Sequence, residues 1–590
     1  MYFIRKTSAA PERVIRYIVV HYTAGLSSVP GSAERIADYF SNFDVSASAD
    51  FIVDNGAAVQ YNPDPANRFC WHCSDIRTDS HGGSLYRVCT DENSIGVEIC
   101  SSCSTEAATS ANDQAYSFSG AVLAQAAELI GYLMDAYHID ISHVVRHYDV
   151  SGKLCPGIVG WNEDSGNADS WYCFRRECLK HSGLATRTSG CIISGSDILH
   201  VLSENGVTCT ADEAFLQTSF SSLAVHSAET APGALFFCKG EHFRPEYLRS
   251  AAENGATGYL SETKIKTELP CLLVSDIAAA MGFVAQAFYG YLQKDLTTVG
   301  VTGTNGKTTV ASLIAAILKE SCGRQPGFLS TVGAYDGLLE RDLTLTTLES
   351  PVIYSFLHET KRNGGTHFVM ECSSQGEKTK RLTGLRYDLG VFTNISDDHY
   401  SPKEHSSFEE YLGYKLDIIR RYRQAVINAD DPHCEVAMKA AAHAERIITY
   451  SLSPDSGAEV YAESIHSMGL RPVFTAITPN WRQQITVPFP GKFNISNALA
   501  ACAAGYLLGI SPEKIAAGIE KTFVHGRMFV FDRYGYSVVV DYAHNYASIR
   551  AALESVRELY PKKKIQLLFG CSGTTGLQRR RDIVRGAAPF

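Results

Sequence analysis

The chain has 590 residues, too many for a single hydrophobic core, so we expect about three to five domains. Hydrophobic residues make up 45% of it and charged residues 20%, and no apolar run reaches the roughly 18 residues of a membrane-spanning helix. With 53 basic and 63 acidic residues the net charge is −10, and no basic tract with interleaved aromatic residues is present. This pattern argues against a membrane span and against a nucleic-acid partner.

The N-terminal segment and the cysteines indicate a cytoplasmic protein. The apolar stretch Tyr17–Tyr22 is short, contains a histidine and is not followed by a small-residue cleavage site, so it predicts a buried strand rather than a targeting sequence. Without a signal peptide, the 17 cysteines are expected to be mostly reduced thiols.

The pattern of the chain changes near residue 187. A stretch rich in Gly, Ser and Asp and the polar run 186–190 separate two regions. Beyond them, apolar runs alternate with helical periodicity: the strand predicted at 296–301 precedes a helix that runs through Leu318 and stops at Gly323. This alternation predicts an α/β region.

A second boundary is predicted near residue 524. After it, the sequence predicts a strand at 536–540, a helix at 548–559 and a further strand at 565–569. A parallel sheet needs both faces covered, so two strands and one helix make a poor domain by themselves.

Three residues near the N-terminus are of the kinds that bind zinc. His21 ends the first predicted strand, His147 follows an apolar run, and Cys155 precedes a proline. Imidazole and thiolate suit Zn²⁺, and three protein ligands leave a fourth position for the water that a hydrolase must activate. Taken singly, each has a structural explanation, because such histidines and buried cysteines usually only pack.

The segments around these residues resemble a family of zinc amidases. Ile18–Ala24, Asn93–Ile99 and Arg146–Pro156 are similar to segments of the N-acetylmuramoyl-L-alanine amidases, which include phage lysozyme-type amidases and peptidoglycan-recognition proteins. The resemblance covers about residues 14–160. It implies zinc on His21, His147 and Cys155, a catalytic pair of Glu98 and Lys153, and a substrate-binding His72.

The implied roles are chemically sensible. Glu98 would take a proton from zinc-bound water and pass it to the leaving amine, while Lys153 and the metal would stabilise the oxyanion. Some family members carry Tyr or His where this sequence has Ala49-Asp50, so an assisting side chain is either absent or replaced by Asp50, and proton transfer depends on Glu98. The pairs Cys70/Cys73 and Cys100/Cys103 either hold a second, structural zinc or are four unrelated thiols.

A phosphate-binding loop follows the strand that begins at Leu296. In Thr302–Thr309 the glycines let backbone amides approach an anion, the helix N-terminus favours negative charge, Lys307 reaches the terminal phosphates and Thr308 can meet Mg²⁺. Val301 occupies the first glycine position of the common pattern.

The form Gly303–Thr309 resembles the phosphate loop of the Mur ligases, and further family motifs follow in order through the region 190–590. The resemblance implies ATP and Mg²⁺ as cofactors. It implies that Lys307 and Lys415 are catalytic and that Lys415 is carbamylated, although a lysine in a helix opened by Ser407 and Glu410 would by default be solvated. The implied magnesium ligands are Thr308, Glu371, His399 and Lys415. The implied nucleotide contacts are Gly303, Thr304, Asn305, Gly306, Lys307, Thr308, Thr309, Asn494, Asn497, Arg527 and Asp541.

The segment Pro232–Gly240 and the pair Thr346-Thr347 resemble the Mur ligase that adds the third peptide residue to UDP-MurNAc-L-Ala-D-Glu. This implies substrate contacts from Thr346, Thr347, Ser373 and Arg381. Leu348, Gln375 and Asn545-Tyr546 depart from the family pattern, which suggests a divergent branch and leaves the acceptor open. The motif that selects the third residue is expected beyond Phe590, so the chain resembles a C-terminally truncated ligase.

Together these resemblances imply an α/β multidomain protein. We expect a mixed-sheet zinc amidase domain at 1–186, a UDP-substrate-binding domain at 187–292, a central P-loop domain at 293–523 and a partial Rossmann-like C-terminal domain at 524–590.

The implied function is bifunctional. One half would hydrolyse the MurNAc-L-Ala amide of muropeptides or peptidoglycan fragments, and the other would add an amino acid to the UDP-MurNAc-peptide through an acyl-phosphate. Two alternatives stay open: a recycling ligase that re-attaches a released peptide, and an N-terminal module that binds muropeptides without cleaving them. The retained Cys155 argues against the second, since non-hydrolytic relatives usually lose that ligand.

Overall fold

The computed structural model divides into two compact units. One comprises Met1–Ser189 with Leu338–Thr344, and the other Gly190–Gly337 with Leu345–Phe590. The residues that the structure describes are 7–11, 13–24, 28–42, 47–73, 83–103, 116–158, 161, 169–182, 191–240, 243–341, 343, 345–396, 405–533, 535–570 and 577–590. Within them, no helix combines the length and apolar character needed to cross a bilayer.

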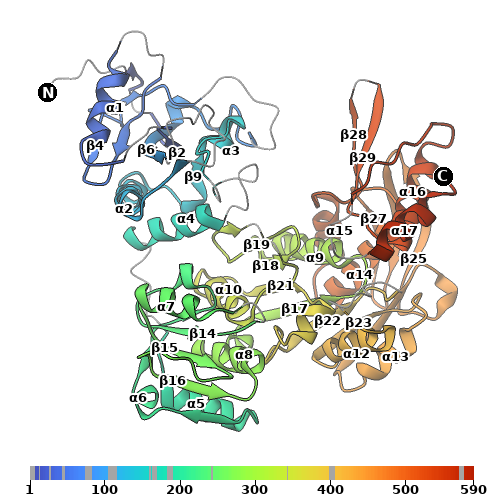
Figure 1. Ribbon diagram of the computed structural model, residues 1–590. Coiled ribbons are helices and arrows are strands. Elements are labelled where there is room, and N and C mark those ends of the chain that lie inside the picture. Colours follow the sequence, from blue (N-terminus) through green and yellow to red (C-terminus); the bar gives the residue numbers. More distant parts are fainter. Residues whose placement is uncertain are drawn as a thin grey trace. The chain divides into compact units, whose positions relative to one another are not determined.

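The first unit is built on a mixed sheet, as expected (Figure 1). β2 (Tyr17–Tyr22) lies between β6 (Ser94–Ile99) and β9 (Val144–Arg146) and runs parallel to both. The sheet continues from β6 to β3 (Phe51–Val53), which is parallel to it, and then to β4 (Ala58–Gln60), which is antiparallel to β3. All six residues of β2 are buried, as in a strand covered on both faces.

Helices pack around this sheet. In α2 (Gly120–Tyr137) the Ser119 side chain accepts a hydrogen bond from the Val122 amide at the start, and His138 ends the helix in a left-handed conformation. Gly131 of α2 lets α4 (Asp169–His181) approach closely, since a Cβ there would lie 2.7 Å from the His181 backbone. The other elements of this unit are α1 (Ser32–Phe40), α3 (His147–Ser151), β1 (Ser8–Ala9), β5 (Arg68–Phe69), β7 (Ser102–Cys103), β8 (Tyr116–Ser117) and β20 (Glu340–Arg341).

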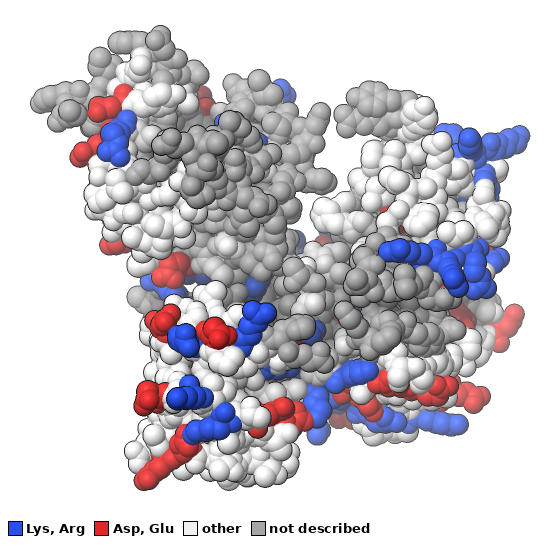
Figure 2. All heavy atoms as spheres, in the orientation of Figure 1, with Lys and Arg blue, Asp and Glu red and all other residues white. Residues whose placement is uncertain are grey.

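The second unit begins with a small α/β domain. Its sheet has the order β11-β16-β15-β14-β13, with β11 antiparallel to β16 and the other pairs parallel. On the face of this domain seen in Figure 2 (lower left), acidic and basic side chains are interspersed. The elements are β10 (Ile193–Ser194), α5 (Gly195–Glu204), β11 (Cys209–Ala211), α6 (Glu213–Leu216), β12 (Ser219–Phe220), β13 (Ser222–Ala224), β14 (Ala234–Phe237), α7 (Pro245–Glu253), β15 (Ala256–Ser261), β16 (Cys271–Val274) and α8 (Ile277–Phe288).

A larger sheet forms the centre of the second unit. Its strands follow the order β19-β18-β21-β17-β22-β23-β24-β25-β26-β27, parallel from β18 to β25 and antiparallel at both ends. Buried aliphatic residues of these strands and of α9 and α14 form one core. The bounds are β17 (Thr297–Thr302), α9 (Lys307–Cys322), β18 (Gly327–Ser330), β19 (Gly333–Tyr335), α10 (Ser350–Arg362), β21 (His367–Glu371), α11 (Ser374–Lys378), β22 (Tyr387–Phe392), α12 (Phe408–Ile419), β23 (Tyr422–Asn428), α13 (Cys434–Ala440), β24 (Arg446–Ser451), β25 (Val460–Met468), β26 (Arg471–Ile477), β27 (Arg482–Thr486), α14 (Lys492–Leu507) and α15 (Pro512–Glu520).

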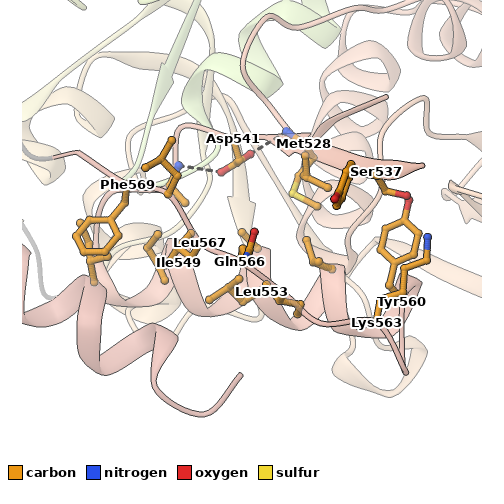
Figure 3. Close-up of a pocket in the computed structure, with 18 of the residues that line it drawn as sticks. Met528, Ser537, Asp541, Ile549, Leu553, Tyr560, Lys563, Gln566, Leu567 and Phe569 are labelled. Carbon is orange, nitrogen blue, oxygen red and sulfur yellow. Dashed lines mark hydrogen bonds between the residues drawn. The ribbon is translucent and has the colours of Figure 1, made fainter. Parts of the chain in front are cut away.

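The C-terminal part differs from the sequence prediction: it lacks one predicted strand and contains a strand and a helix that were not predicted. β28 (Phe529–Arg533) and β29 (Tyr536–Val540) form an antiparallel hairpin, followed by α16 (Tyr546–Leu559) and α17 (Leu577–Ala587). The strand predicted at 565–569 is wrong: this segment is described and has no strand structure. Its backbone joins no ladder of the described strands, and its large apolar side chains are exposed, Leu568 at 98%. Instead, the segment lines a cavity of about 600 Å³, and Leu567 and Phe569 are among its lining residues (Figure 3).

Candidate functional sites

Strand register brings the predicted amidase residues together. His21 in β2 is the register partner of Glu98 in the neighbouring strand β6, so both side chains leave the same face of the sheet. On the other side of β2, Arg146 at the end of β9 pairs with Val20. His147, the next residue, begins α3 and therefore lies beside His21, with ring centroids 4.7 Å apart.

A tight turn after α3 places Cys155, the third donor, beside the two histidines. Gly152 ends this helix with φ 79°, in the left-handed region, and the Tyr148 amide donates to the Cys155 carbonyl at 2.9 Å. The Cys155 thiol then lies 3.7 Å from Nδ1 of His21. One donor atom from each of His21, His147 and Cys155 lies within 4.8 Å of the others.

The state of these donors fits a zinc ion. Both ring nitrogens of His147 are buried, and among the described residues neither has a hydrogen-bond partner, which is costly unless another group satisfies them. Burial lowers the pKa of His147 to about 3 and that of His21 well below its usual value, so both rings are neutral, the form that binds a metal. Burial raises the pKa of the Cys155 thiol to about 12, so its thiolate needs an adjacent cation.

Glu98 and Lys153 lie next to this donor set. The Oε2 atom of Glu98 is buried and has no hydrogen-bond partner in the part of the chain that the structure describes. Burial raises the pKa of Glu98 to about 7, and the positive charge of Lys153 partly opposes this shift. A carboxyl group that titrates near neutrality can act as a general acid and base. The Lys153 side chain is exposed.

His72 lies behind the donor set. Its side chain is buried, with 8% of the residue exposed, and its Nδ1 atom lies 3.2 Å from Nε2 of His21. The ring packs against Gly96, where a Cβ would come within 2.6 Å of it. In this structure His72 therefore contacts a zinc-site residue, while the neighbouring Trp71 is 46% exposed.

The four cysteines considered for a second zinc do not converge. Cys70 and Cys100 belong to one buried cluster, whereas Cys73 packs with Cys89 in another. Cys73 instead approaches His72 and Asp91, whose donor-type atoms lie within 4.8 Å of one another. One oxygen of Asp91 already accepts the His72 and Cys73 amides, at 2.9 and 2.6 Å.

The phosphate loop lies between β17 and α9. Gly303 and Gly306 have φ values of 152° and 86°, in the region that favours glycine. A Cβ at Gly303 would lie 1.9 Å from Oγ1 of Thr393, and one at Gly306 would lie 2.4 Å from Oδ1 of Asn497. Lys307 Nζ donates to the carbonyls of Gly303 and Thr304, at 2.8 and 2.9 Å.

A cavity of about 530 Å³ opens over this loop. Its lining includes the loop residues Thr304–Thr309 together with Asn497, Arg527 and Asp541, all of which the sequence places at the nucleotide. Asn494 does not line the cavity; its Oδ1 accepts a hydrogen bond from Asn497 Nδ2 at 3.1 Å and so holds Asn497 toward it. Arg527 donates to Thr308 Oγ1 at 3.3 Å, and burial raises the pKa of Asp541. The two glycines leave the loop backbone without side chains that would block an anion. This backbone and the cavity above it fit a nucleotide phosphate chain.

Two of the predicted magnesium ligands converge beside the loop. Glu371 ends β21 as the register partner of Val301, and its Oε1 accepts hydrogen bonds from Ser330 Oγ at 2.5 Å and the Thr331 amide at 2.9 Å. Lys415 is buried at 2% exposure, and its amine donates to the Gly303 carbonyl at 2.8 Å. Thr308 also lies at the cavity, and His399 lies outside the described residues.

The predicted substrate residues form a connected group. The Ser373 amide donates to Thr347 Oγ1 at 3.1 Å, and Arg381 donates to the Thr347 carbonyl at 3.1 Å. Thr346 Oγ1 accepts from Thr331 Oγ1 at 3.2 Å.

Sequence reasoning missed several members of these sites. Glu349 joins the group through Arg381, at 3.0 Å, and through Lys239 at 2.6 Å. Ser330 and Thr331 hold Glu371 but belong to no local motif, so only the sheet order brings them there. Asp50, which the sequence indicated as a possible replacement for an assisting side chain, is fully buried.

Family models match along the chain. The model for N-acetylmuramoyl-L-alanine amidase matches residues 11–158, that for the Mur ligase middle domain 301–505, and that for the Mur ligase, glutamate ligase domain 526–590.

Curated relatives and solved structures agree with these matches. The UDP-N-acetylmuramoyl-L-alanyl-D-glutamate--L-lysine ligase of Streptococcus sanguinis (strain SK36) is 38% identical over 62% of this chain and 73% of its own length. That of Enterococcus faecalis (strain ATCC 700802 / V583) is 35% identical over 65% and 77%. A solved UDP-N-acetylmuramoyl-L-alanyl-D-glutamate--2,6-diaminopimelate ligase matches with a TM-score of 0.52 at 25% identity, over 67% of this chain and 80% of that chain.

The fold and the two sites thus define an enzyme with an amidase domain and an ATP-dependent ligase region. The chain belongs to the Mur ligase family and carries an N-terminal domain of the N-acetylmuramoyl-L-alanine amidase family.

Proposed function

We propose that the N-terminal domain is a zinc-dependent amidase that cleaves the bond between MurNAc and L-Ala in muropeptides or peptidoglycan fragments. One observation carries this: three donors of zinc-binding type lie within 4.8 Å, and one of them, His147, has both ring nitrogens buried without a partner.

The residues of this domain would have three roles in hydrolysis: metal binding, proton transfer and stabilisation of negative charge. His21, His147 and Cys155 would hold the zinc ion, which supplies an activated water and a positive charge for the developing oxyanion. Glu98 takes the proton at its carboxylate and returns it to the leaving amine, a role that suits a pKa near 7. Lys153 places its ammonium group where negative charge develops on the substrate carbonyl.

Substitution of Cys155 by Ser tests this proposal. Zinc content and release of peptide from a muropeptide are measured in the wild type and in Cys155→Ser, with the exposed Cys173→Ser as the matched control. We expect both to fall in the first variant only. Undiminished cleavage by Cys155→Ser refutes the proposed site, and zinc binding without cleavage in the wild type favours a muropeptide-binding module.

We propose that the second unit adds an amino acid to UDP-MurNAc-L-Ala-D-Glu. The observation that carries this is the cavity over the phosphate loop, on which Glu371 and the family-matched nucleotide residues converge. The two curated relatives named above are L-lysine ligases and the solved structure is a 2,6-diaminopimelate ligase, so the acceptor of this chain is a separate question, and Leu348 and Gln375 depart from the family pattern.

In this ligase, ATP would supply the phosphoryl group that activates the substrate carboxylate as an acyl-phosphate, leaving as ADP, and Mg²⁺ would neutralise the charge of the phosphates. Lys307 and the backbone amides of the loop bind and orient the phosphates. Thr308, Glu371, His399 and a carbamylated Lys415 would hold the metal, and Thr346, Thr347, Ser373 and Arg381 would orient the UDP-linked peptide. Such a nucleotide-linked substrate is consistent with a cytoplasmic location.

Acceptor-dependent release of ADP tests the ligase. Purified full-length chain is incubated with ATP and UDP-MurNAc-L-Ala-D-Glu, and single amino acids are compared as acceptors. Ligation of a tripeptide onto UDP-MurNAc, with no reaction of single amino acids, favours the recycling alternative. Product formation by Lys307→Met at the wild-type rate refutes the assignment of the phosphate loop.

Lys415 carbamylation has its own readout. Isotopically labelled bicarbonate should give a carbamate resonance in the wild type that is absent from Lys415→Arg. The same resonance in both proteins refutes carbamylation at this position.

A further inference from the structure

Three side chains of different chemistry meet in the small α/β domain of the second unit. Lys264 Nζ donates to Cys271 Sγ at 3.1 Å and to the two carboxylate oxygens of Asp212 at 3.0 and 2.7 Å. The Cys271 thiol in turn donates to Asp212 Oδ2 at 3.2 Å. An amine, a thiol and a carboxylate thus contact one another, and none of the three belongs to either candidate site.

The main chain holds all three residues in place. Cys271 begins β16; its amide donates to Asp212 Oδ2 at 3.2 Å, and the Asp212 amide donates to the Cys271 carbonyl at 3.0 Å. The register partner of Cys271 in β15 is Tyr259, whose hydroxyl also borders the thiol. This hydroxyl donates to the Ile265 carbonyl at 3.1 Å and accepts from the Ile265 amide at 3.2 Å. The residue next to Lys264 is therefore tied to the strand beside Cys271.

The sulfur is buried, but its polar partners reach the solvent. Cys271 is 1% exposed, whereas the Lys264 and Asp212 side chains are 56% and 42% exposed. A small polar oxidant such as hydrogen peroxide has a polar route to the sulfur along these two side chains. A neighbouring lysine ammonium group stabilises a thiolate, which is the form of cysteine that reacts with oxidants.

We propose that Lys264 and Cys271 form a reversible covalent cross-link, a sulfenamide, when the chain meets a peroxide. In the first step the sulfur attacks a peroxide oxygen, so that an S–O bond forms and the O–O bond breaks. Asp212 takes the thiol proton and passes it to the departing hydroxide, which leaves as water. The product is a sulfenic acid at Cys271, the first stage of cysteine oxidation.

In the second step the amine of Lys264 captures this sulfenic acid. An S–N bond forms, the S–O bond breaks and the oxygen leaves as a second water molecule. Overall the ammonium group, the thiol and one peroxide give the sulfenamide, two water molecules and one released proton. The sulfur loses the two electrons that the peroxide gains.

The capture step needs a neutral amine at a short distance from the sulfur. Hydrogen bonds to Asp212 and to Cys271 raise the pKa of Lys264, so the amine is protonated in the reduced chain. The base in reach is Asp212, 2.7 Å from Nζ. The Nζ–Sγ distance of 3.1 Å lies within the roughly 3–3.5 Å that separates well-placed reacting atoms. We therefore expect the sulfenic acid to form first and the cross-link to follow it more slowly.

Peptide mapping by mass spectrometry tests the cross-link directly. The full-length chain is treated with hydrogen peroxide, its free thiols are alkylated, and it is cut after Glu268, which places Lys264 and Cys271 in different peptides. We expect the two peptides to stay joined, at a mass lower by two hydrogen atoms than their sum. A thiol reductant should then separate them.

Two lysine substitutions provide the comparison. Lys264→Arg keeps a positive charge but removes the primary amine, so the cross-link should be lost and a 1,3-diketone probe should trap the sulfenic acid at Cys271. Lys266→Arg, at an exposed position two residues along, should cross-link like the wild type. Thermal unfolding of both variants checks that they fold, and the mapping of the wild type holds whether or not they do.

Four results would overturn the inference. The first is a disulfide between Cys271 and Cys238, which lies in the same buried cluster. The second is an oxidised Cys271 with a free Lys264, and the third is the same cross-link in Lys264→Arg. The fourth is a Cys271 that stays reduced under conditions that oxidise the exposed Cys322. The inference depends on neither proposed activity, so its failure leaves both intact.

Discussion

At Gly306 the main chain turns with φ 86°, and an added Cβ would meet Oδ1 of Asn497 at 2.4 Å. Gly323, at the other end of α9, has φ 69° and open space around it. Both positions would strain an alanine by roughly 1–2 kcal/mol, but only the first would also displace a residue that lines the nucleotide cavity.

We therefore expect Gly306→Ala to lose both stability and ATP affinity, and Gly323→Ala to lose stability alone. Calorimetric binding of an ATP analogue and thermal unfolding measure the two effects. Equal ATP affinities for the two variants would contradict the assignment of Gly306 to the phosphate loop.

The carboxyl group of Glu98 predicts the pH dependence of the amidase. It acts as a base only when ionised, and burial raises its pKa to about 7, so kcat/KM should fall as the pH drops below that value. A bound zinc ion lowers this pKa, so the acidic limb should lie at about 7 or below it.

Glu98→Gln should reduce amide cleavage by about 10²- to 10⁴-fold and abolish the limb. The exposed Glu92→Gln in the same domain should leave the profile unchanged. A pH profile of Glu98→Gln that matches the wild type would exclude this carboxyl group as the base.

Residues in local motifs could be predicted from the sequence, and partners contributed from afar could not. His21, His147 and Cys155 were found because each is surrounded by characteristic neighbours. The position of His72 depends on the close approach of Gly96 to its ring, which a sequence pattern does not encode.

At the scale of elements, α12 illustrates how local signals are used. Ser407 caps the helix by accepting from the Glu410 amide at 3.2 Å, as predicted. In a complete capping box, the Glu410 carboxylate would also accept from the Ser407 amide. Here it accepts instead from the Ser406 amide at 2.6 Å and pairs with Lys378 at 2.8 Å. These partners lower the pKa of Glu410.

Ser407→Ala should cost about 1 kcal/mol of unfolding free energy, because the first turn of α12 loses its cap. Since α12 also carries Lys415, ATP turnover should decline with it. Ser203→Ala, on the exposed side of α5, should change stability by less than about 0.5 kcal/mol. Chemical denaturation measures both, and equal effects would contradict the capping role.

Among elements, those with strong periodicity were predictable: β29 was expected at the residues where it is found, and Gly323 ends α9 as expected. The segment 565–569 was not, although it is as apolar as a strand. Here the run is not even buried, since Leu568 is 98% exposed, and a strand also needs a neighbour whose backbone groups are free, which depends on the rest of the sheet.

At the scale of the whole molecule, the two units have separate buried cores and separate candidate sites. Because a ligand stabilises only the part of the chain whose folded form binds it, zinc and nucleotide should act on different unfolding transitions. The division at Ser189 and Gly190 lies beside the change of sequence pattern near residue 187, whereas the finer domain boundaries remain predictions.

Differential scanning calorimetry should therefore show one transition raised by zinc and another raised by an ATP analogue with Mg²⁺. At a ligand concentration 100 times its Kd the stabilisation should be about 2.7 kcal/mol. His147→Ala should remove the zinc response and keep the nucleotide response. A single transition that responds to both ligands would show that the units unfold together.

The register of β2 against β6 and β9 also has a consequence for biosynthesis. His21 and Cys155 are 134 residues apart in the chain, and a slip of one residue in β2 would turn His21 to the opposite face of the sheet. During translation no zinc site can exist until Cys155 has left the ribosome and the three parallel strands have paired. Metal uptake thus reports the completed folding of the N-terminal domain, while the ligase region is still being synthesised.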